Sequence, residues 1–388
     1  MKKTILALNN ISKAAETKLK ADYNFTTESD APDAIVLRSF SMHDYALPGS
    51  VLAVARAGAG TNNIPVAEYA KKGVVVFNTP GANANAVKEL VIAALIMSGR
   101  KLVDGIKWVD TLAGKGAEIG KTVESGKKAF VGREILGKTL GVIGLGAIGI
   151  LVANAALALG MKVVGYDPYL TTDHALKIDS KVVVVESLDE LMSESDFVTI
   201  HVPYMESTKN TINAANIAKM KKGSVVINLA RGELVDTDAV LDAVKSGQLS
   251  RFVTDFPSEK VIGVENVIAL PHLGASTPEA EDNCAIMAAA ELKDFLENGN
   301  VKNSVNFPSC SAPRAGAERI TVIHKNEKSV LSAITDIIGK AGCNIENFVS
   351  QSRGEYAYAI VDTTEELPDS AIESICKMSS VIKCRVIK

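Results

Sequence analysis

Three polar residues in the second half of the sequence combine the chemistry needed to handle a 2-hydroxy or 2-keto acid. Arg231 follows the apolar run 225–229, and a planar guanidinium binds a carboxylate through two parallel hydrogen bonds. His272 follows the apolar run 267–270, and an imidazole can give or take a proton near neutral pH. Glu259 is a carboxylate that could orient this imidazole.

Structural alternatives exist for these residues. Arg231 could instead pair with a nearby acid such as Asp236 at a strand end. Of the other four histidines, His43 and His174 lie in polar segments, where exposure is expected. His201 ends an apolar run, where core packing or a place beside a cofactor is expected rather than chemistry.

A glycine-rich turn after residues 140–143 has the pattern of a dinucleotide site. Gly144, Gly146 and Gly149 stand between an expected strand and an expected helix, where they permit a tight turn, close approach of a pyrophosphate and close helix packing. Asp167 follows the next expected strand and can accept hydrogen bonds from ribose hydroxyls. No arginine adjoins Asp167, so NAD is favoured over NADP. A structural turn with a loop aspartate is the alternative.

Short apolar runs alternate with helical segments through most of the chain, which predicts an α/β fold. The runs lie at 34–37, 51–54, 74–77, 139–143, 163–166, 182–185, 197–200 and 225–228. Runs that are apolar on both faces are typical of parallel strands covered by helices, and we expect two separate doubly wound units. Residues 114–128, rich in glycine and lysine, are expected to form a loop over the cleft between domains.

The end of the chain has a different pattern. A cap at 276–279 predicts a helix that ends near 298–300, and the prolines in 307–314 predict a linker. The last seventy-odd residues have the ferredoxin-like order β-α-β-β-α-β. These elements are expected at 319–324, 330–340, 345–351, 356–361, 372–378 and 382–387.

Bulk properties restrict the class of protein. A length of 388 residues suggests two or three domains, and a net charge of −3 argues against nucleic acid or an anionic membrane as the main partner. No stretch is long and apolar enough for a membrane-spanning helix.

The start resembles a signal peptide, but Asn9 and Asn10 end the apolar run early, so a strand at 4–8 is expected. The five cysteines show no metal-site spacing, so we expect no metal, reduced thiols and a cytoplasmic protein.

Seven segments, in order, resemble the D-2-hydroxyacid dehydrogenase family, most closely its 3-phosphoglycerate dehydrogenases. They are 56–64, 78–81, the glycine turn with Asp167, 201–203, 228–232, 254–257 and 271–274. The resemblance covers essentially the whole chain. It implies an enzyme that oxidises 3-phospho-D-glycerate to 3-phosphooxypyruvate with NAD, in the first step of L-serine biosynthesis. A dehydrogenase for another D-2-hydroxy acid, or a non-catalytic NAD sensor similar to the corepressors of the family, is the alternative.

The resemblance also implies residue roles: Arg231 binds the substrate carboxylate, His272 is the acid–base, and Glu259 is its partner. NAD would be held by Thr79, Gly144, Gly146, Ala147, Ile148, Gly149, Asp167, His201, Val202, Pro203, Ala230, Arg231, Asp255, His272 and Gly274. Further substrate contacts would come from Arg38, Ser39, Arg56, Ala57 and Gly58, with Lys127 or Lys128 adding charge for the phosphate. The segment 254–259 is one residue shorter than is usual in the family, so either Asp255 or Glu259 is expected to be displaced.

The resemblance further implies three domains. A Rossmann NAD domain (99–284) would be inserted in a flavodoxin-like substrate domain (1–98 and 285–310), so that closure about the two crossings assembles the site. Residues 317–388 resemble an ACT domain, the fold that binds L-serine across a dimer in phosphoglycerate dehydrogenases. The matching effector residues are His324, Asn326 and Asn344, whereas Lys328 and Ser329 replace the usual Pro-Gly. We expect a homodimer or homotetramer.

Overall fold

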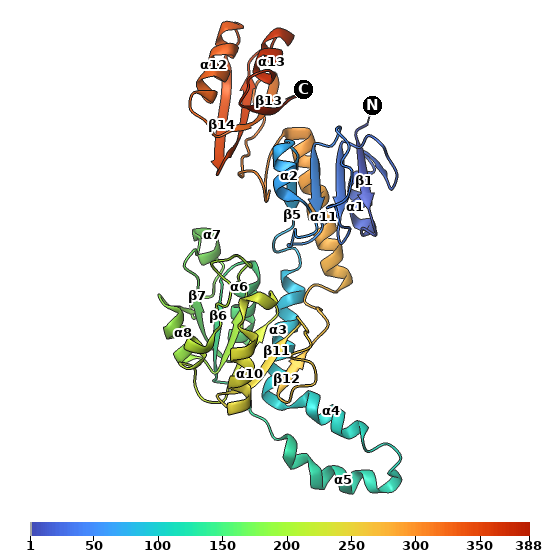
Figure 1. Ribbon diagram of the computed structural model, residues 1–388, viewed down its shortest axis with the longest axis vertical. Coiled ribbons are helices and arrows are strands. Elements are labelled where there is room, and N and C mark those ends of the chain that lie inside the picture. Colours follow the sequence, from blue (N-terminus) through green and yellow to red (C-terminus); the bar gives the residue numbers. More distant parts are fainter. Residues whose placement is uncertain (1) are drawn as a thin grey trace. The chain divides into compact units, whose positions relative to one another are not determined.

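The computed structural model describes residues 2–388, which divide into two compact units (Figure 1). The first unit combines Met1–Asn83 with Glu281–Lys388, and the second is the continuous stretch Ala84–Ala280. The chain thus leaves the first unit once and returns to it. The three-domain division expected from the resemblance stays a prediction.

The first unit contains a five-stranded parallel sheet in the order β2-β1-β3-β4-β5. This is the flavodoxin-like order, so the predicted class is confirmed. All four residues of β3 are buried, as expected for a strand covered on both faces. The elements are β1 (Thr4–Leu8), α1 (Lys13–Leu19), β2 (Asn24–Thr26), β3 (Ala34–Leu37), β4 (Ala53–Arg56), α2 (Val66–Lys71) and β5 (Val75–Asn78).

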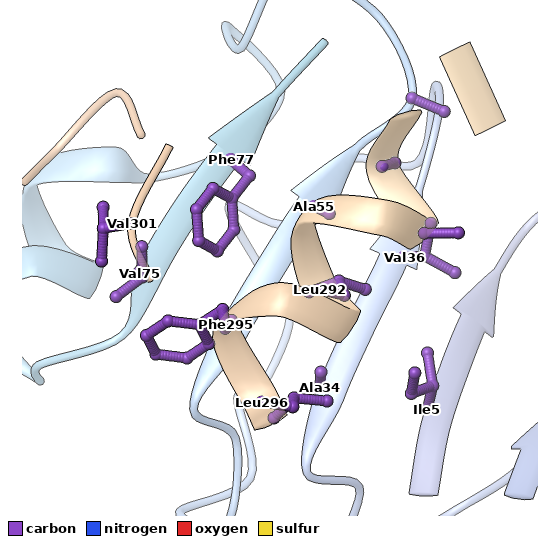
Figure 2. Close-up of a cluster of buried hydrophobic side chains, with 14 of the residues drawn as sticks. Ile5, Ala34, Val36, Ala55, Val75, Phe77, Leu292, Phe295, Leu296 and Val301 are labelled. Atoms are coloured by element: carbon purple, nitrogen blue, oxygen red, sulfur yellow. The ribbon is translucent and has the colours of Figure 1, made fainter. Parts of the chain in front are cut away.

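Helix α11 (Pro278–Asn298) is distant in sequence from this sheet but packs on it. Figure 2 shows Phe295 of the helix against Phe77 of β5, whose ring centroids are 5.6 Å apart in an edge-on arrangement. Such pairs stabilise a core beyond their buried area. The helix begins where the sequence predicted, because the Thr277 hydroxyl accepts a hydrogen bond from the Ala280 backbone N–H at 3.1 Å.

The second unit contains a seven-stranded parallel sheet in the order β12-β11-β10-β9-β6-β7-β8. The chain adds β7 and β8 on one side of β6 and then continues with β9 on the other, which makes the doubly wound Rossmann order. Separate apolar clusters pack on the sheet. The strands are β6 (Thr139–Ile143), β7 (Lys162–Tyr166), β8 (Val183–Val184), β9 (Phe197–Ile200), β10 (Ser224–Asn228), β11 (Leu249–Thr254) and β12 (Val267–Ala269). The helices with them are α3 (Ala84–Arg100), α6 (Ala147–Ala158), α7 (Thr172–Ala175), α8 (Leu188–Glu194), α9 (Ala214–Ile217), η3 (Gly232–Leu234) and α10 (Thr237–Ser246).

The prediction of a loop at 114–128 is wrong, because most of this segment is helical. It continues from α4 (Leu102–Asp110) through η1 (Gly116–Glu118) and α5 (Ile119–Gly126) into η2 (Lys127–Phe130). Gly114 and Gly116 adopt positive φ angles of 85° and 54° and form the turn between α4 and α5. Residues 102–130 thus form a helical hairpin. The ring of Trp108 in α4 packs on the ring of Phe130 at the end of η2, with centroids 5.1 Å apart, and holds its two arms together.

The C-terminal module has the predicted β-α-β-β-α-β order and an antiparallel sheet in the order β14-β15-β13-β16. Its apolar core lies between this sheet and two helices. The elements are β13 (Glu318–Lys325), α12 (Val330–Lys340), β14 (Ile345–Arg353), β15 (Tyr356–Thr363), α13 (Asp369–Cys376) and β16 (Val381–Ile387). The fold class predicted for this part is therefore confirmed.

The module is packed against the end of α11 rather than tethered to it. Arg319 is fully buried, binds both carboxylate oxygens of Asp362 at 2.6 and 2.7 Å, and donates to the Asn298 carbonyl at 2.8 Å. Arg385 lies over the Phe295 ring at 4.5 Å. The segment 307–314 connects the parts as predicted, but it is not a free linker, since Phe307 is fully buried.

Every helix within residues 2–388 is too short or too polar to span a bilayer. The five cysteines are all free thiols. Burial raises the pKa of the Cys310 thiol to about 11, so this sulfur stays protonated and unreactive.

Candidate active site

The predicted catalytic and cofactor residues of the second unit follow the carboxyl ends of its parallel strands. In open parallel sheets this edge is where ligands bind. The glycine turn follows β6, Asp167 follows β7, His201 follows β9, Ala230 and Arg231 follow β10, Asp255 follows β11, and His272 follows β12.

Each of the three positions in the turn is glycine for a different structural reason. Gly144 has a φ of 91°, and a side chain there would come within 2.8 Å of Val202. A side chain at Gly149 would lie 1.9 Å from the Gly144 carbonyl oxygen, so the close approach of helix α6 requires glycine. Gly146 faces open space, since nothing lies within 4 Å of a methyl group built there. A phosphate can therefore approach the backbone at Gly146 and the first turn of α6 at Ala147 and Ile148.

Asp167 is placed beside this turn. Its Oδ2 accepts a hydrogen bond from the Leu145 backbone N–H at 2.9 Å, and its Oδ1 accepts one from the Tyr169 backbone N–H at 2.9 Å. A carboxylate oxygen has two lone pairs, so both oxygens keep capacity for ribose hydroxyls. The negative charge of the Asp167 carboxylate disfavours a phosphate group on the ribose, which supports NAD over NADP.

His201 lies on the opposite side of the glycine turn. Its Nε2 lies 3.0 Å from the Thr199 hydroxyl, whereas its buried Nδ1 has no partner in the described chain. Burial lowers the pKa of His201 to about 3, so the ring is neutral and does not act as a general acid. A neutral imidazole next to Val202 and the exposed Pro203 fits the predicted place beside a cofactor. Together with the open face at Gly146, these residues fit a dinucleotide.

Arg231 is held in a turn braced by Asn228. The Asn228 amide donates to the Arg231 carbonyl at 2.8 Å, and its Oδ1 accepts from the Ala230 N–H at 3.2 Å. The guanidinium donates to the Ala230 carbonyl at 2.6 Å and forms no ion pair within residues 2–388. The alternative pairing with Asp236 is absent from the described chain, because Asp236 caps helix α10. The guanidinium therefore keeps donors for a ligand carboxylate.

His272 has a constrained backbone and an exposed side chain. Its φ is 50°, in the left-handed region, and its N–H donates to the Asp255 carbonyl at 3.0 Å. The imidazole packs on the Phe256 ring with centroids 4.8 Å apart. Phe256 was not predicted from the sequence, although it lies in one of the segments that carry the resemblance.

Asp255 is the buried acid of this site. It is only 1% exposed, its Oδ2 accepts from the Gly274 N–H at 3.1 Å, and its Oδ1 has no partner among residues 2–388. Burial raises the pKa of Asp255, and the Gly274 N–H and the positive charges of His272 and Arg231 offset part of that rise. The carboxyl thus interacts electrostatically with both residues predicted to do the chemistry.

Glu259 is not brought against His272. It lies in an exposed turn after β11, and throughout the described chain it has no hydrogen bond or ion pair. Its neighbour Lys260 binds Asp238 at 2.7 Å. Asp255 is thus buried at the strand end and Glu259 is exposed, and which of the two the shortened segment displaces stays a prediction.

The predicted substrate residues of the first unit also follow strand ends. Arg38 and Ser39 follow β3, and Arg56 to Gly58 end and follow β4. Thr79, which was predicted to hold NAD, follows β5 in the same unit. Arg38 pairs with Glu281 at 2.5 Å, and the Arg56 Nε donates to the Arg38 carbonyl at 3.2 Å. The sequence did not reveal that Asn9 holds this loop, accepting from the Arg38 N–H and donating to the Ser39 hydroxyl. The only sequence signal was that Asn9 ends the first apolar run.

Lys127 and Lys128 differ from the other predicted residues. They are exposed in η2, and Lys127 pairs with Glu124 of the same hairpin at 2.5 Å. They follow a helix rather than a strand. Their role in phosphate binding stays a prediction.

The predicted effector residues lie around one end of β13 and before β14. The His324 ring is buried and its Nδ1 lies 2.8 Å from the Lys325 carbonyl, while Asn326 donates to the Gly354 carbonyl at 3.2 Å. The Asn344 N–H donates to Glu365 at 3.3 Å. Ser329 has a φ of 66°, so this position adopts the left-handed conformation that glycine prefers.

Comparisons with known proteins agree with this geometry. The family described as D-isomer specific 2-hydroxyacid dehydrogenase, NAD binding domain, matches residues 92–274. The D-3-phosphoglycerate dehydrogenase of Escherichia coli (strain K12) is 33% identical over 341 residues, which covers 84% of this chain and 79% of that protein.

Solved structures show the same likeness. The 3-phosphoglycerate dehydrogenase of Entamoeba histolytica with bound NAD+ is 28% identical, with a TM-score of 0.62 over 79% of this chain and 99% of that one. A glyoxylate reductase from Paecilomyes thermophila is 26% identical, with a TM-score of 0.64 over 78% and 98% of the two chains. The chain belongs to the D-isomer specific 2-hydroxyacid dehydrogenase family and is an NAD-dependent oxidoreductase.

Proposed function

We propose that this protein oxidises 3-phospho-D-glycerate to 3-phosphooxypyruvate with NAD, the first step of L-serine biosynthesis. The observation that carries the proposal is the 33% identity over 341 residues to the D-3-phosphoglycerate dehydrogenase of Escherichia coli. The β-α-β-β-α-β module at the C-terminus supports it, because the resemblance links such a module to phosphoglycerate dehydrogenases.

In the proposed reaction, the Arg231 guanidinium binds the substrate carboxylate through two hydrogen bonds and so orients C2. Bound NAD supplies the chemistry of accepting the hydride that leaves C2. The His272 imidazole takes the proton of the C2 hydroxyl as the carbonyl forms, and it returns that proton in the reverse direction. Further contacts to the substrate are assigned to Arg38, Ser39, Arg56, Ala57 and Gly58.

A spectrophotometric NADH assay over a panel of keto acids tests the substrate. We expect kcat/KM for 3-phosphooxypyruvate to exceed that for pyruvate or glyoxylate by about a hundredfold, because a phosphate adds charge-assisted hydrogen bonds that the smaller acids lack. Equal or higher kcat/KM for glyoxylate would replace this substrate with an unphosphorylated acid, in line with the likeness to a glyoxylate reductase.

We further propose that Asp255, rather than Glu259, is the carboxylate that supports a protonated His272. Asp255 is buried and interacts electrostatically with His272, whereas Glu259 is exposed. Reduction of a keto acid requires the protonated imidazole. In the Asp255→Asn variant we expect kcat/KM for reduction to fall about tenfold, because the variant removes the carboxyl group that interacts electrostatically with His272 and Arg231.

The matched control for this prediction is Glu259→Gln, which removes the exposed carboxylate. Its kcat/KM for reduction, measured at saturating NADH, is expected to equal that of the unaltered protein. A tenfold loss of kcat/KM in Glu259→Gln together with an unchanged value in Asp255→Asn would return the role to Glu259.

We infer that L-serine binds around His324, Asn326 and Asn344 and inhibits the enzyme. Ser329 supports this inference because it keeps a left-handed backbone although glycine is absent from this position. The NADH assay repeated with L-serine measures the inhibition. The apolar side chains of Ile106 in α4 (63%) and of Val131, just after η2 (70%), are exposed, which supports a homodimer or homotetramer. Light scattering measures the oligomeric state directly. The free cysteines support a cytoplasmic location.

A further inference from the structure

A buried acid in α11 takes no part in the proposed chemistry. Glu291 is 8% exposed, and its Oε1 accepts a hydrogen bond from the Asn303 side-chain amide at 2.7 Å. Its Oε2 is buried and has no partner within the described residues. Burial raises the pKa of Glu291 to about 8, so the side chain is largely a neutral carboxylic acid at neutral pH.

Asn303 connects this acid to strand β5. Its φ of 55° is left-handed, and its carbonyl accepts a hydrogen bond from the Asn78 N–H at 3.3 Å. The next residues continue alongside the strand, with a bridge between Phe77 and Ser304. The segment after α11 is thus held along β5 up to the point where the strand ends. Figure 2 shows Leu292 and Phe295, which belong to the same part of α11, in the apolar cluster with Phe77.

The end of β5 in turn holds the loop after β4. The Asn78 side-chain amide donates to the Ala59 carbonyl at 2.6 Å, and the Thr79 N–H donates to the Gly58 carbonyl at 3.1 Å. Three consecutive links therefore join Glu291 to this loop, first through Asn303, then through the Asn78 backbone, and last through the Asn78 side chain.

We propose that Glu291 is a positioning residue that sets the conformation of the loop 56–60 through Asn303 and Asn78. The inference rests on the proposed function, in which Arg56, Ala57 and Gly58 contact the substrate. A side chain at position 291 with a hydrogen-bond acceptor holds Asn303 in its left-handed conformation, and the charge of the acid is not required. Loss of the acceptor loosens the loop and weakens substrate binding, while the NAD-binding residues of the second unit are unaffected.

The test compares Glu291→Leu with Glu291→Gln in steady-state assays at saturating NADH, using whichever keto acid the panel shows to be the best substrate. Glu291→Leu is expected to raise KM for the keto acid about tenfold, as for the loss of one buried hydrogen bond, with kcat and KM for NADH within about twofold. Glu291→Gln keeps the acceptor and is expected to retain the KM of the unaltered protein. Glu297→Gln, at an exposed site on the same helix, keeps an acceptor for the Tyr23 hydroxyl and is the control expected to leave KM for the keto acid unchanged.

A second variant keeps the inference testable if Glu291→Leu does not fold. Asn303→Gly retains the left-handed backbone and the carbonyl that Asn78 binds but removes the amide, so it is expected to raise KM to the same extent. The double variant Glu291→Leu with Asn303→Gly is expected to have a KM no higher than that of either single variant, because both substitutions remove the same hydrogen bond. An unchanged KM in Asn303→Gly, or a fall in kcat alone, overturns the inference. A different order of substrates in the panel overturns only the assignment to 3-phosphooxypyruvate, because the ratio of variant to unaltered KM does not depend on it.

Discussion

Replacing His272 by asparagine is expected to lower the rate of hydride transfer about 10³-fold, the loss typical when a positioned general acid–base is removed. Asparagine suits the test because His272 has a φ of 50°, a left-handed conformation that asparagine adopts more readily than alanine. The variant therefore removes the proton carrier and keeps the turn between β12 and α11. Stopped-flow measurement of a single turnover reports this step even where product release limits kcat.

His174→Asn is the matched control, because His174 lies on α7 outside the proposed chemistry. Its single-turnover rate is expected to equal that of the unaltered protein. NADH binding, followed by fluorescence titration, is expected to survive in His272→Asn. A His272→Asn rate within tenfold of the control would assign the proton transfer to another group.

Replacing Arg231 by lysine is expected to lower kcat/KM for the keto acid about a hundredfold, although the charge is kept. The guanidinium offers a planar pair of donors that matches a carboxylate, whereas an ammonium binds it as a point charge. Arg231 has no ion pair within residues 2–388, so the substitution breaks no salt bridge of the fold. Steady-state kinetics with the keto acid and with the aldehyde that lacks its carboxylate measure the effect.

The discrimination between these two substrates is the decisive quantity. The unaltered protein is expected to favour the acid strongly over the aldehyde, and Arg231→Lys is expected to lose most of that preference. Arg100→Lys, an exposed site at the end of α3, serves as the control and is expected to keep it. Undiminished discrimination in Arg231→Lys would remove Arg231 from the carboxylate site.

The strand-end residues could be predicted because local pattern and topology agree there. Parallel strands buried on both faces read as apolar runs, and polar residues just after such runs meet at one edge of the sheet. Arg231, His272 and Asp167 each follow a predicted strand, and the structure places all three at that edge. The glycine spacing was equally informative. Gly144 is required by its positive φ, and Gly149 is required because a side chain there would lie 1.9 Å from the Gly144 carbonyl oxygen.

Segments without such a pattern were predicted less well. Residues 114–128 contain enough glycine and lysine to suggest a loop, yet they form α5, which is braced by the Trp108–Phe130 contact. Helix formation there depends on packing between α4 and η2, which no local window contains. The connection at 307–314 is packed for the same reason, with Phe307 buried against the Tyr356 ring.

Apolar periodicity and glycine spacing are local properties of the chain, so they were enough to predict the two doubly wound sheets, the dinucleotide turn and the positions of Arg231 and His272. The acid that interacts with His272 became evident only from the folded protein. A one-residue shortening is visible in the sequence, but only the fold shows that Asp255 is buried at the strand end while Glu259 is exposed. The fold also decided the link from Glu291 to the loop 56–60. Its central hydrogen bond joins Asn78 to Asn303, which are more than two hundred positions apart, so it follows from how the segment after α11 packs on β5 and no spacing in the sequence encodes it.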